Sequence, residues 1–395
     1  MPFQSPCNNP CGYPIGIPPC EPICNPPNPC PLRSFCDAGL ANTCNPLPLV
    51  NPCAPRRAVT TWRVNYLVSN RNNHAAHIDL ALINPWGIVI FNNQLWVANN
   101  MTDTITNYDL FGNNILRPTS IRNAVHNSSY PTGIVVNCGG GFSTTNGLVT
   151  RTSQFLITSE HGTVHAHHPQ LQDSLSNCTV TKSNVVLNQQ LTGEVSVYKG
   201  LALANNTLYL ADFFQSHIDV FDSSYNRLLG FHFIDGDTCD PIPLDYGPNN
   251  IVNIGCHLYV LWARKEPHVS IHDFKGPGQG YISVFNLNGS FVRRFTSRGV
   301  LNAPWGMIPA PCECGFAPGS FLVSNTGDGR INVFDCNGRY AGPMLNQAGL
   351  PIFIDGVRGL APHYTDFSEI FFTASANEDT EGLVGSIIKD QVIYF

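Results

Sequence analysis

Five acidic or imidazole side chains follow apolar runs in different parts of the chain and could together bind a metal ion. They are Glu160, His161, Asp212, Asp328 and Glu378. Carboxylates and imidazoles are the ligands that Ca²⁺ and Zn²⁺ use in proteins. Because these residues come from four different segments, with Glu160 and His161 adjacent, a site forms only if the fold brings the segments together.

Other histidines and acids form groups closer in sequence. His165 and His167 would share one face of a strand and could bind a metal, although a surface strand that carries imidazoles is the simpler expectation. His268, His272 and Asp273 lie in a loop before GPGQG and could also hold a metal. The sequence DGDTCD at residues 235–240 is weakly similar to a calcium loop, but it lacks the Gly and Glu at the sixth and twelfth places of an EF-hand.

The sequence contains no motif of several common catalytic classes. Nothing in it resembles a Ser-His-Asp nucleophile elbow, a phosphate-binding loop or a dinucleotide fingerprint. Metal binding is therefore the remaining chemistry for which residues can be named.

Cysteines are concentrated in the first 58 residues. Eight of the 15 lie there, namely Cys7, Cys11, Cys20, Cys24, Cys30, Cys36, Cys44 and Cys53. Proline dominates between them and prevents helix and sheet interiors, so order must come from cross-links, a metal or a partner. Disulfides are favoured over zinc because the closest spacings are CxxxC without a paired His; reduced, disordered thiols are the third alternative.

The start of the chain predicts no secretory signal, because MPFQSP has no basic region followed by an apolar one. The ordinary cytosol keeps thiols reduced, so a cysteine-rich arm needs an explanation. Three explanations are open: a renumbered mature chain, another export route, or a dedicated thiol oxidase inside the cell, as for virion proteins of large DNA viruses.

The candidate residues belong to a pattern that occurs six times between residues 84 and 390. Each copy has three short apolar runs with the period-two alternation of half-buried strands. The first run carries a Gly before aliphatic residues, and Asn250 takes that place in the fourth copy. The third runs are spaced by 49 to 64 residues when aligned at Tyr108, His167, Phe221, Phe285, Phe334 and Ile388.

A repeat of this length built from short strands predicts a β-propeller, since stacking six copies round an axis buries both faces of each small sheet. We expect an all-β protein with a six-bladed β-propeller of four-stranded blades over residues 59–395, preceded by the irregular Cys/Pro-rich arm of residues 1–58. Outer strands are expected at residues 226–233 and 289–295, among others. Residues 61–68 are expected to close the ring beside the strand that holds Ser386, with residues 391–395 competing for that place.

Propeller geometry places one set of polar residues on the face where the innermost strands begin. Ligands of propellers usually bind there, at the central channel. The binding candidates on this face are Asn99, Asp103, Glu160, His161, Tyr198, Asp212, Arg264, Asn325, Asp328, Arg358 and Glu378. The face also collects Lys199 and the Pro-Trp-Gly tryptophans Trp86 and Trp305, which are expected to pack and not to hold ligands.

Composition excludes several classes of protein. Hydrophobic residues make up 43% and charged residues 12%, with 34 Gly and 31 Pro, which fits an all-β protein rich in turns. The net charge is −6 without a long basic run, so no nucleic-acid partner is expected. No apolar stretch approaches the roughly 20 residues of a membrane span.

The blade region resembles a family of uncharacterised six-bladed propellers, related to the NHL type and found mainly in secreted bacterial proteins. The matching stretches are LINPWGI, PTGIVVN, VYKGLALANNTLYLADFFQSHIDVFD, HDFKGPGQGYISVFNLNGSFVRRF, LNAPWGM, GDGRINVFD and IDGVRGL, between residues 62 and 389. The resemblance implies a fold and no activity. The chain departs from that family in its arm and in lacking a signal or sorting tail, which indicates a giant-virus version.

Two classes of function follow. The first, which we expect, is a non-enzymatic structural or interaction propeller of a virion surface or fibre, virion-borne or extracellular. It would have no cofactor and would bind itself and other surface or virion proteins through residues 1–58. The alternative is a propeller hydrolase or lyase with calcium or zinc at the central channel, because six-bladed relatives include lactonases and an amidating lyase with such sites.

Overall fold

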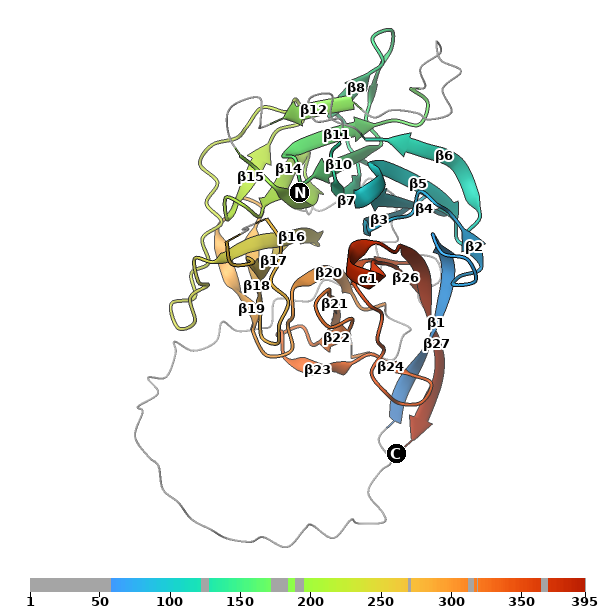
Figure 1. Ribbon diagram of the computed structural model, residues 1–395. Coiled ribbons are helices and arrows are strands. Elements are labelled where there is room, and N and C mark those ends of the chain that lie inside the picture. Colours follow the sequence, from blue (N-terminus) through green and yellow to red (C-terminus); the bar gives the residue numbers. More distant parts are fainter. Residues whose placement is uncertain are drawn as a thin grey trace, which may run out of the picture.

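The computed structural model consists almost entirely of strands arranged as six sheets round a common axis (Figure 1). It describes residues 58–121, 128–171, 184–188, 195–268, 271–311, 316–317, 319–363 and 369–394. The eight arm cysteines lie outside these residues. Cys138 and Cys256 are each disulfide-bonded, although no disulfide joins two described cysteines to each other.

Six blades follow one another in chain order, each with its first strand innermost. Blade 1 is β3 (Pro85–Phe91), β4 (Gln94–Asn99), β5 (Thr104–Asp109) and β6 (Asn114–Ser120). Blade 2 is β7 (Pro131–Val136), β10 (Phe155–Ser159), β11 (Thr163–His167) and β12 (Asn184–Asn188). Blade 3 is β13 (Tyr198–Ala204), β14 (Thr207–Asp212) and β15 (His217–Phe221).

The second half of the ring repeats this plan. Blade 4 is β16 (Tyr246–Ile254), β17 (His257–Arg264), β18 (Gly280–Asn286) and β19 (Phe291–Ser297). Blade 5 is β20 (Pro304–Pro309), β21 (Phe321–Asn325), β22 (Ile331–Phe334) and β23 (Tyr340–Pro343). Blade 6 is β25 (Val357–Pro362), β26 (Glu369–Ala374), β27 (Leu383–Tyr394) and β1 (Ala58–Ser69). The predicted all-β six-bladed propeller is confirmed.

Short elements complete the described chain. Strands β2 (His77–Ile78) and β24 (Leu345–Asn346) pair with β1, and β8 (Ser143–Thr145) pairs with β9 (Thr150–Thr152). The helical turns are η1 (Asn100–Thr102) and α1 (Ala376–Asp379). No helix among the described residues is long and apolar enough to cross a membrane.

The ring is closed by the N-terminal strand, as the isolated strand signal predicts. Strand β1 runs antiparallel to β27, with Asn65 opposite Ser386 and Trp62 opposite Lys389. The C-terminal residues do not compete with β1 for this place. They continue β27, so that Thr60 lies opposite Val392. A strand from one end of the chain is thus hydrogen-bonded to a strand from the other end.

Blade 3 departs from the four-stranded expectation, because residues 226–233 do not form an outer strand. They make a single bridge between Phe221 and Arg227, formed by the backbone hydrogen bonds from Asp222 to Asn226 and from Leu228 to Val220. Gly230 then adopts a φ of 91° and turns the chain away. Phe233 beyond it packs into the core between blades 3 and 4, so burial of an aromatic ring replaces ladder pairing there.

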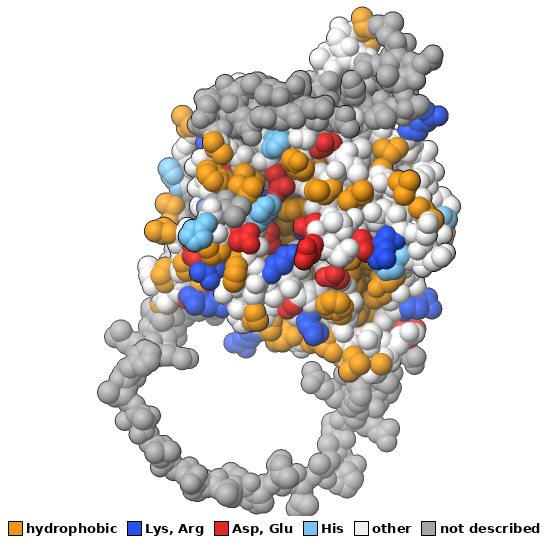
Figure 2. Space-filling view, viewed as in Figure 1, with side chains coloured by type: hydrophobic (Ala, Val, Ile, Leu, Met, Phe, Trp, Pro, Cys, Tyr) orange, Lys and Arg blue, Asp and Glu red, His pale blue; other side chains and the backbone are white. Residues whose placement is uncertain are grey.

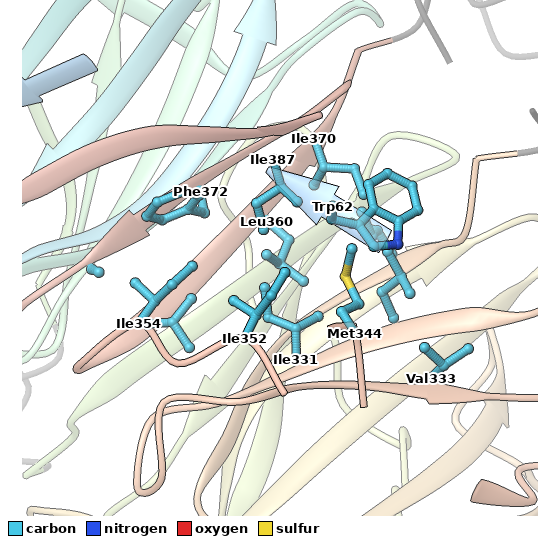
Figure 3. Packing of buried hydrophobic residues seen from close by; sticks show 14 of the residues in the cluster. Trp62, Ile331, Val333, Met344, Ile352, Ile354, Leu360, Ile370, Phe372 and Ile387 are labelled. Carbon is cyan, nitrogen blue, oxygen red and sulfur yellow. The ribbon is translucent and has the colours of Figure 1, made fainter. Parts of the chain in front are cut away.

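The core consists of layers between neighbouring blades, and Figure 3 shows the layer between blades 5 and 6. Trp62 of β1 lies in this layer with about 1% of its surface exposed, and its ring stacks on Phe316 at 5.4 Å between centroids. Ile352 and Ile387 contribute from the loop after β24 and from β27. The strand that closes the ring therefore also supplies a large part of the adjacent core.

The recurring glycine of the innermost strands is explained by close packing of neighbouring blades. A Cβ on Gly87 would lie 2.8 Å from the backbone nitrogen of Ile134, and one on Gly359 would lie 2.6 Å from the carbonyl oxygen of Trp86. In blade 4 the space admits Asn250, whose amide donates a hydrogen bond to the carbonyl of Trp305 at 2.7 Å. The one exception to the glycine pattern thus links its blade to the next.

Substitution of this glycine is expected to weaken the ring. Gly359→Ala should lower the free energy of unfolding by about 1–3 kcal/mol, because the methyl group meets backbone atoms that cannot rotate away. Gly140→Ala is the matched control, since a Cβ there has no neighbour within 4 Å. Urea denaturation of both variants measures the difference, and equal midpoints would contradict this explanation of the repeat.

Candidate functional site at the channel face

Four inner strands bring large and charged side chains to the centre of the channel face. Trp86 from β3 and Trp305 from β20 meet edge to face, with ring centroids 6.0 Å apart. The Arg358 guanidinium lies 4.4 Å from the centroid of the Trp86 ring, and the Lys199 ammonium lies 5.3 Å from it. With Asp273, these residues are called the central cluster.

The charges of the central cluster are paired with one another or with close neighbours. Lys199, which is fully buried, donates a 3.0 Å hydrogen bond to the carboxylate of Asp273. Burial alone would raise the pKa of Asp273, but the attraction of Lys199 and Arg358 overrides it and lowers the pKa to about 2. Arg358 donates to Asn84 at 3.1 Å and to Asp379 at 2.9 Å. Asp273 therefore forms a salt bridge with Lys199, and among the described residues it does not group with His268 and His272 as metal ligands.

The rim between blades 1 and 2 holds three more of the predicted site residues. Asn100 donates a 3.1 Å hydrogen bond to Glu160. Asp103, at a φ of 52°, accepts the backbone N–H of Tyr130 at 2.9 Å. The ring of His161 lies edge to face with Tyr130 at 5.1 Å. The first two contacts join blades 1 and 2, whereas the ring contact lies within blade 2. Figure 2 shows acidic and basic side chains interspersed around the middle of the face.

Five other predicted site residues are not members of the central cluster, and a side-chain hydrogen bond joins two of them, Asn325 and Asp328. They are Asn99, Arg264, Asn325, Asp328 and Glu378. Asn99 and Asn325 are buried and their side-chain amides donate hydrogen bonds to neighbouring residues of the fold. Arg264 forms an ion pair of 2.7 Å with Asp245. Burial raises the pKa of Asp328, whereas Glu378 is exposed.

Blade 3 contains a compact group of titratable side chains, Tyr198, Asp212, His217 and Asp219, called here the blade-3 cluster. Among the described residues, Asp212, His217 and Asp219 are the group that could hold a metal ion, with ligand atoms within 4.8 Å of one another. Sequence reasoning selected Tyr198 and Asp212 but missed the other two. The signal was available in HIDVFD, because alternate residues of a strand share a face.

Hydrogen bonds set the protonation of the blade-3 cluster. The bond between His217 Nε2 and Asp219 Oδ1, at 3.1 Å, raises the pKa of His217. Burial opposes ionisation of Asp219, but hydrogen bonds from His217 and Tyr198 lower its pKa. Burial raises the pKa of Asp212. From the sequence we expected metal ligands contributed by several blades, whereas Asp212, His217 and Asp219 all lie in blade 3.

The loop at residues 235–240 is held by arginines. Arg294 donates two hydrogen bonds to the carboxylate of Asp235, at 2.8 and 2.9 Å. Arg298 forms an ion pair with Asp240 at 3.0 Å. Two of the three acids that suggested a weak calcium loop, Asp235 and Asp240, are thus paired with basic side chains of blade 4, and Asp237 accepts the backbone N–H of Cys239.

We expected His165 and His167 on a surface strand, but this expectation is wrong, because both are buried in β11. His165 is fully buried and lies within hydrogen-bonding distance of the hydroxyls of Ser129 and Thr163, at 3.2 and 3.0 Å. Burial lowers the pKa of His165 to about 3 and that of His167 to about 4. The strand lies between β10 and β12, so both of its edges are paired, and all five of its residues are buried, so protein covers both of its faces as well.

This burial predicts a loss of stability in acid. The unfolded chain binds a proton at His165 below about pH 6.5, whereas the folded chain does so only near pH 3, so stability should fall as pH drops through this interval. One such histidine costs about 2 kcal/mol at pH 5. Urea unfolding at pH 7 and pH 5 should show a smaller difference for His165→Gln than for His232→Gln, whose side chain is exposed. An equal pH dependence in the two variants would contradict the assignment.

Comparisons with known proteins place the chain among viral proteins. No known family profile matches the sequence. It is 69% identical over 368 residues to uncharacterized protein L690 of Acanthamoeba polyphaga mimivirus, covering 93% of this chain and 96% of the relative. It is 67% identical over 367 residues to uncharacterized protein R648 of the same virus, covering 93% and 90%.

Solved structures are similar in fold alone. A protein of unknown function from Bacteroides thetaiotaomicron is 12% identical with a TM-score of 0.52, and the match covers 85% of this chain and 77% of that one. A streptogramin B lyase is 10% identical with a TM-score of 0.48, covering 84% and 98%. The chain belongs to the family of uncharacterised mimivirus proteins that includes L690 and R648, and it is a six-bladed β-propeller.

Proposed function

We propose that this protein is a non-enzymatic structural or interaction propeller, a component of a virion surface or fibre that assembles through the cysteine-rich arm of residues 1–58. In this proposal the propeller is a rigid disc and the arm provides the contacts to neighbouring subunits. Its partners are copies of itself and other surface or virion proteins.

The observation that carries this proposal is the pairing of charges in the central cluster. Ligands of propellers usually bind at the channel mouth, yet here Lys199 is fully buried against Asp273 and Arg358 is about 3% exposed. A substrate or a channel metal would have to displace these pairs and leave a charge buried without a partner. The arrangement therefore supports a structural role over a hydrolase or lyase with calcium or zinc in the channel.

The composition of the arm supports assembly. Eight cysteines lie among prolines, with little apolar material to form a core. In the chain-entropy treatment, one disulfide that closes a loop of about 15 residues stabilises the folded form by about 3 kcal/mol, so several could order an arm without a core. An extended arm of 50 residues reaches up to roughly 165 Å, which is enough to cross a neighbouring molecule.

The test compares the full chain with a variant that lacks residues 1–57, so that β1 is kept whole. On non-reducing gels the full chain should give a ladder of oligomers that collapses with reductant. Light scattering after gel filtration should find the truncated variant monomeric. A full-length protein that is monomeric with eight free arm thiols under native conditions would overturn the proposal.

A further inference from the structure

We propose that the blade-3 cluster is a zinc site in which Asp212, His217 and Asp219 are the protein ligands. Nothing in this proposal depends on the arm or on the assembly proposed above. The site lies within one blade, on its second and third strands, and shares no residue with the central cluster.

The strand register places the three ligands on one face of the sheet. Asp212, the last residue of β14, lies directly opposite His217, the first residue of β15. Asp219 follows two residues later on β15 and therefore faces the same side as His217. Their ligand atoms lie within 4.8 Å of one another. Tetrahedral zinc with bonds of about 2.1 Å separates its ligands by about 3.4 Å, so a small rotation of the half-exposed His217 ring would close the site.

Asp212 provides an independent indication that a ligand belongs here. Its Oδ1 accepts hydrogen bonds from the backbone N–H groups of Gln215 and Val197, at 3.0 and 3.2 Å. Its Oδ2 has no hydrogen-bond partner, although the residue is fully buried. A buried carboxylate oxygen without a partner is costly, and a bound cation would satisfy it.

The neighbouring residues hold the carboxylate of Asp219 in place. Its Oδ2 accepts a 2.7 Å hydrogen bond from the hydroxyl of the buried Tyr198, and its Oδ1 forms an ion pair of 2.5 Å with Arg227. Such outer contacts orient metal ligands. His217 is 43% exposed, so a cation and a water in the fourth position can enter from solvent.

The site has a structural use in this blade. Zinc would replace the hydrogen bond between His217 and Asp219 and tie the end of β14 to β15. Blade 3 has three strands among the described residues, whereas the other five blades have four. A metal that links β14 to β15, the outer strand of this blade, would compensate for the hydrogen bonds that a fourth strand would provide.

Zinc titration of the full chain tests the proposal. The protein is freed of metal with chelator and its accessible thiols are alkylated, so that cysteines cannot bind zinc. Calorimetric titration with zinc chloride should find one site, bound at least tenfold more weakly in His217→Gln and in Asp219→Asn. His232→Gln, with an exposed imidazole on a neighbouring segment, is the control and should bind as the unaltered chain does.

Two further measurements distinguish loss of zinc binding from loss of the fold. Circular dichroism without zinc establishes that each variant is folded, and zinc should raise the unfolding temperature of the unaltered chain and of His232→Gln only. Equal zinc affinity in His217→Gln and His232→Gln would overturn the proposal. So would an unaltered chain that binds no zinc. Assembly through the arm is measured on gels and is unaffected by either result.

Discussion

Replacing Lys199 with methionine is expected to lower the free energy of unfolding by about 3–5 kcal/mol. Lys199 is fully buried and its ammonium group is 3.0 Å from the carboxylate of Asp273. Methionine keeps much of the side-chain volume but leaves Asp273 charged and without that partner at the centre of the channel face. Urea denaturation at neutral pH measures the loss.

Two controls show whether the effect comes from the buried pair. Arg71→Met removes a surface pair with Glu381, in which Arg71 is 57% exposed, and should cost no more than about 1 kcal/mol. Adding Asp273→Asn to Lys199→Met should restore part of the stability, because the unpaired charge is removed. If Lys199→Met cost no more than Arg71→Met, the central cluster would not be a stabilising element.

Deleting residues 1–69 is expected to abolish the cooperative fold, whereas deleting residues 1–57 should leave it intact. The longer deletion removes β1, which pairs along nearly the whole length of β27. It also removes Trp62 from the core, and the loss of a buried tryptophan alone costs about 3–5 kcal/mol. The 12-residue strand β27 would be left as an open edge, which favours aggregation.

Gel filtration and thermal unfolding distinguish the two deletions. The protein without residues 1–57 should elute as a compact species with one sharp transition. The protein without residues 1–69 should elute in the void volume or show no transition. If the protein without residues 1–69 were soluble and folded cooperatively, five complete blades and an incomplete sixth would be enough for a stable fold, which would contradict the prediction.

The sequence by itself determined the architecture, because the features that specify a propeller are local and recur. Period-two alternation marks the strands. The glycine that five of the six first runs share, such as Gly87, indicates the close approach of the next blade. The lone strand signal before the first repeat had one place left to pair, and β1 occupies it. Because the three runs recur in the same order six times, the prediction of a propeller does not depend on any single residue.

Only the tertiary structure decided which polar residues meet. Lys199 and Asp273 are 74 residues apart, so no local pattern predicts their pairing. His165 and His217 each lie on a strand with the same alternation of polar and apolar residues. His165 is buried and His217 is half exposed, because burial depends on what covers each sheet. The prediction of an outer strand at residues 226–233 was wrong for the same reason. Phe233 is buried in the core between blades 3 and 4 instead of pairing with β15. Strand identity depends on nearest neighbours in sequence, whereas a site depends on contacts that the whole ring must form first.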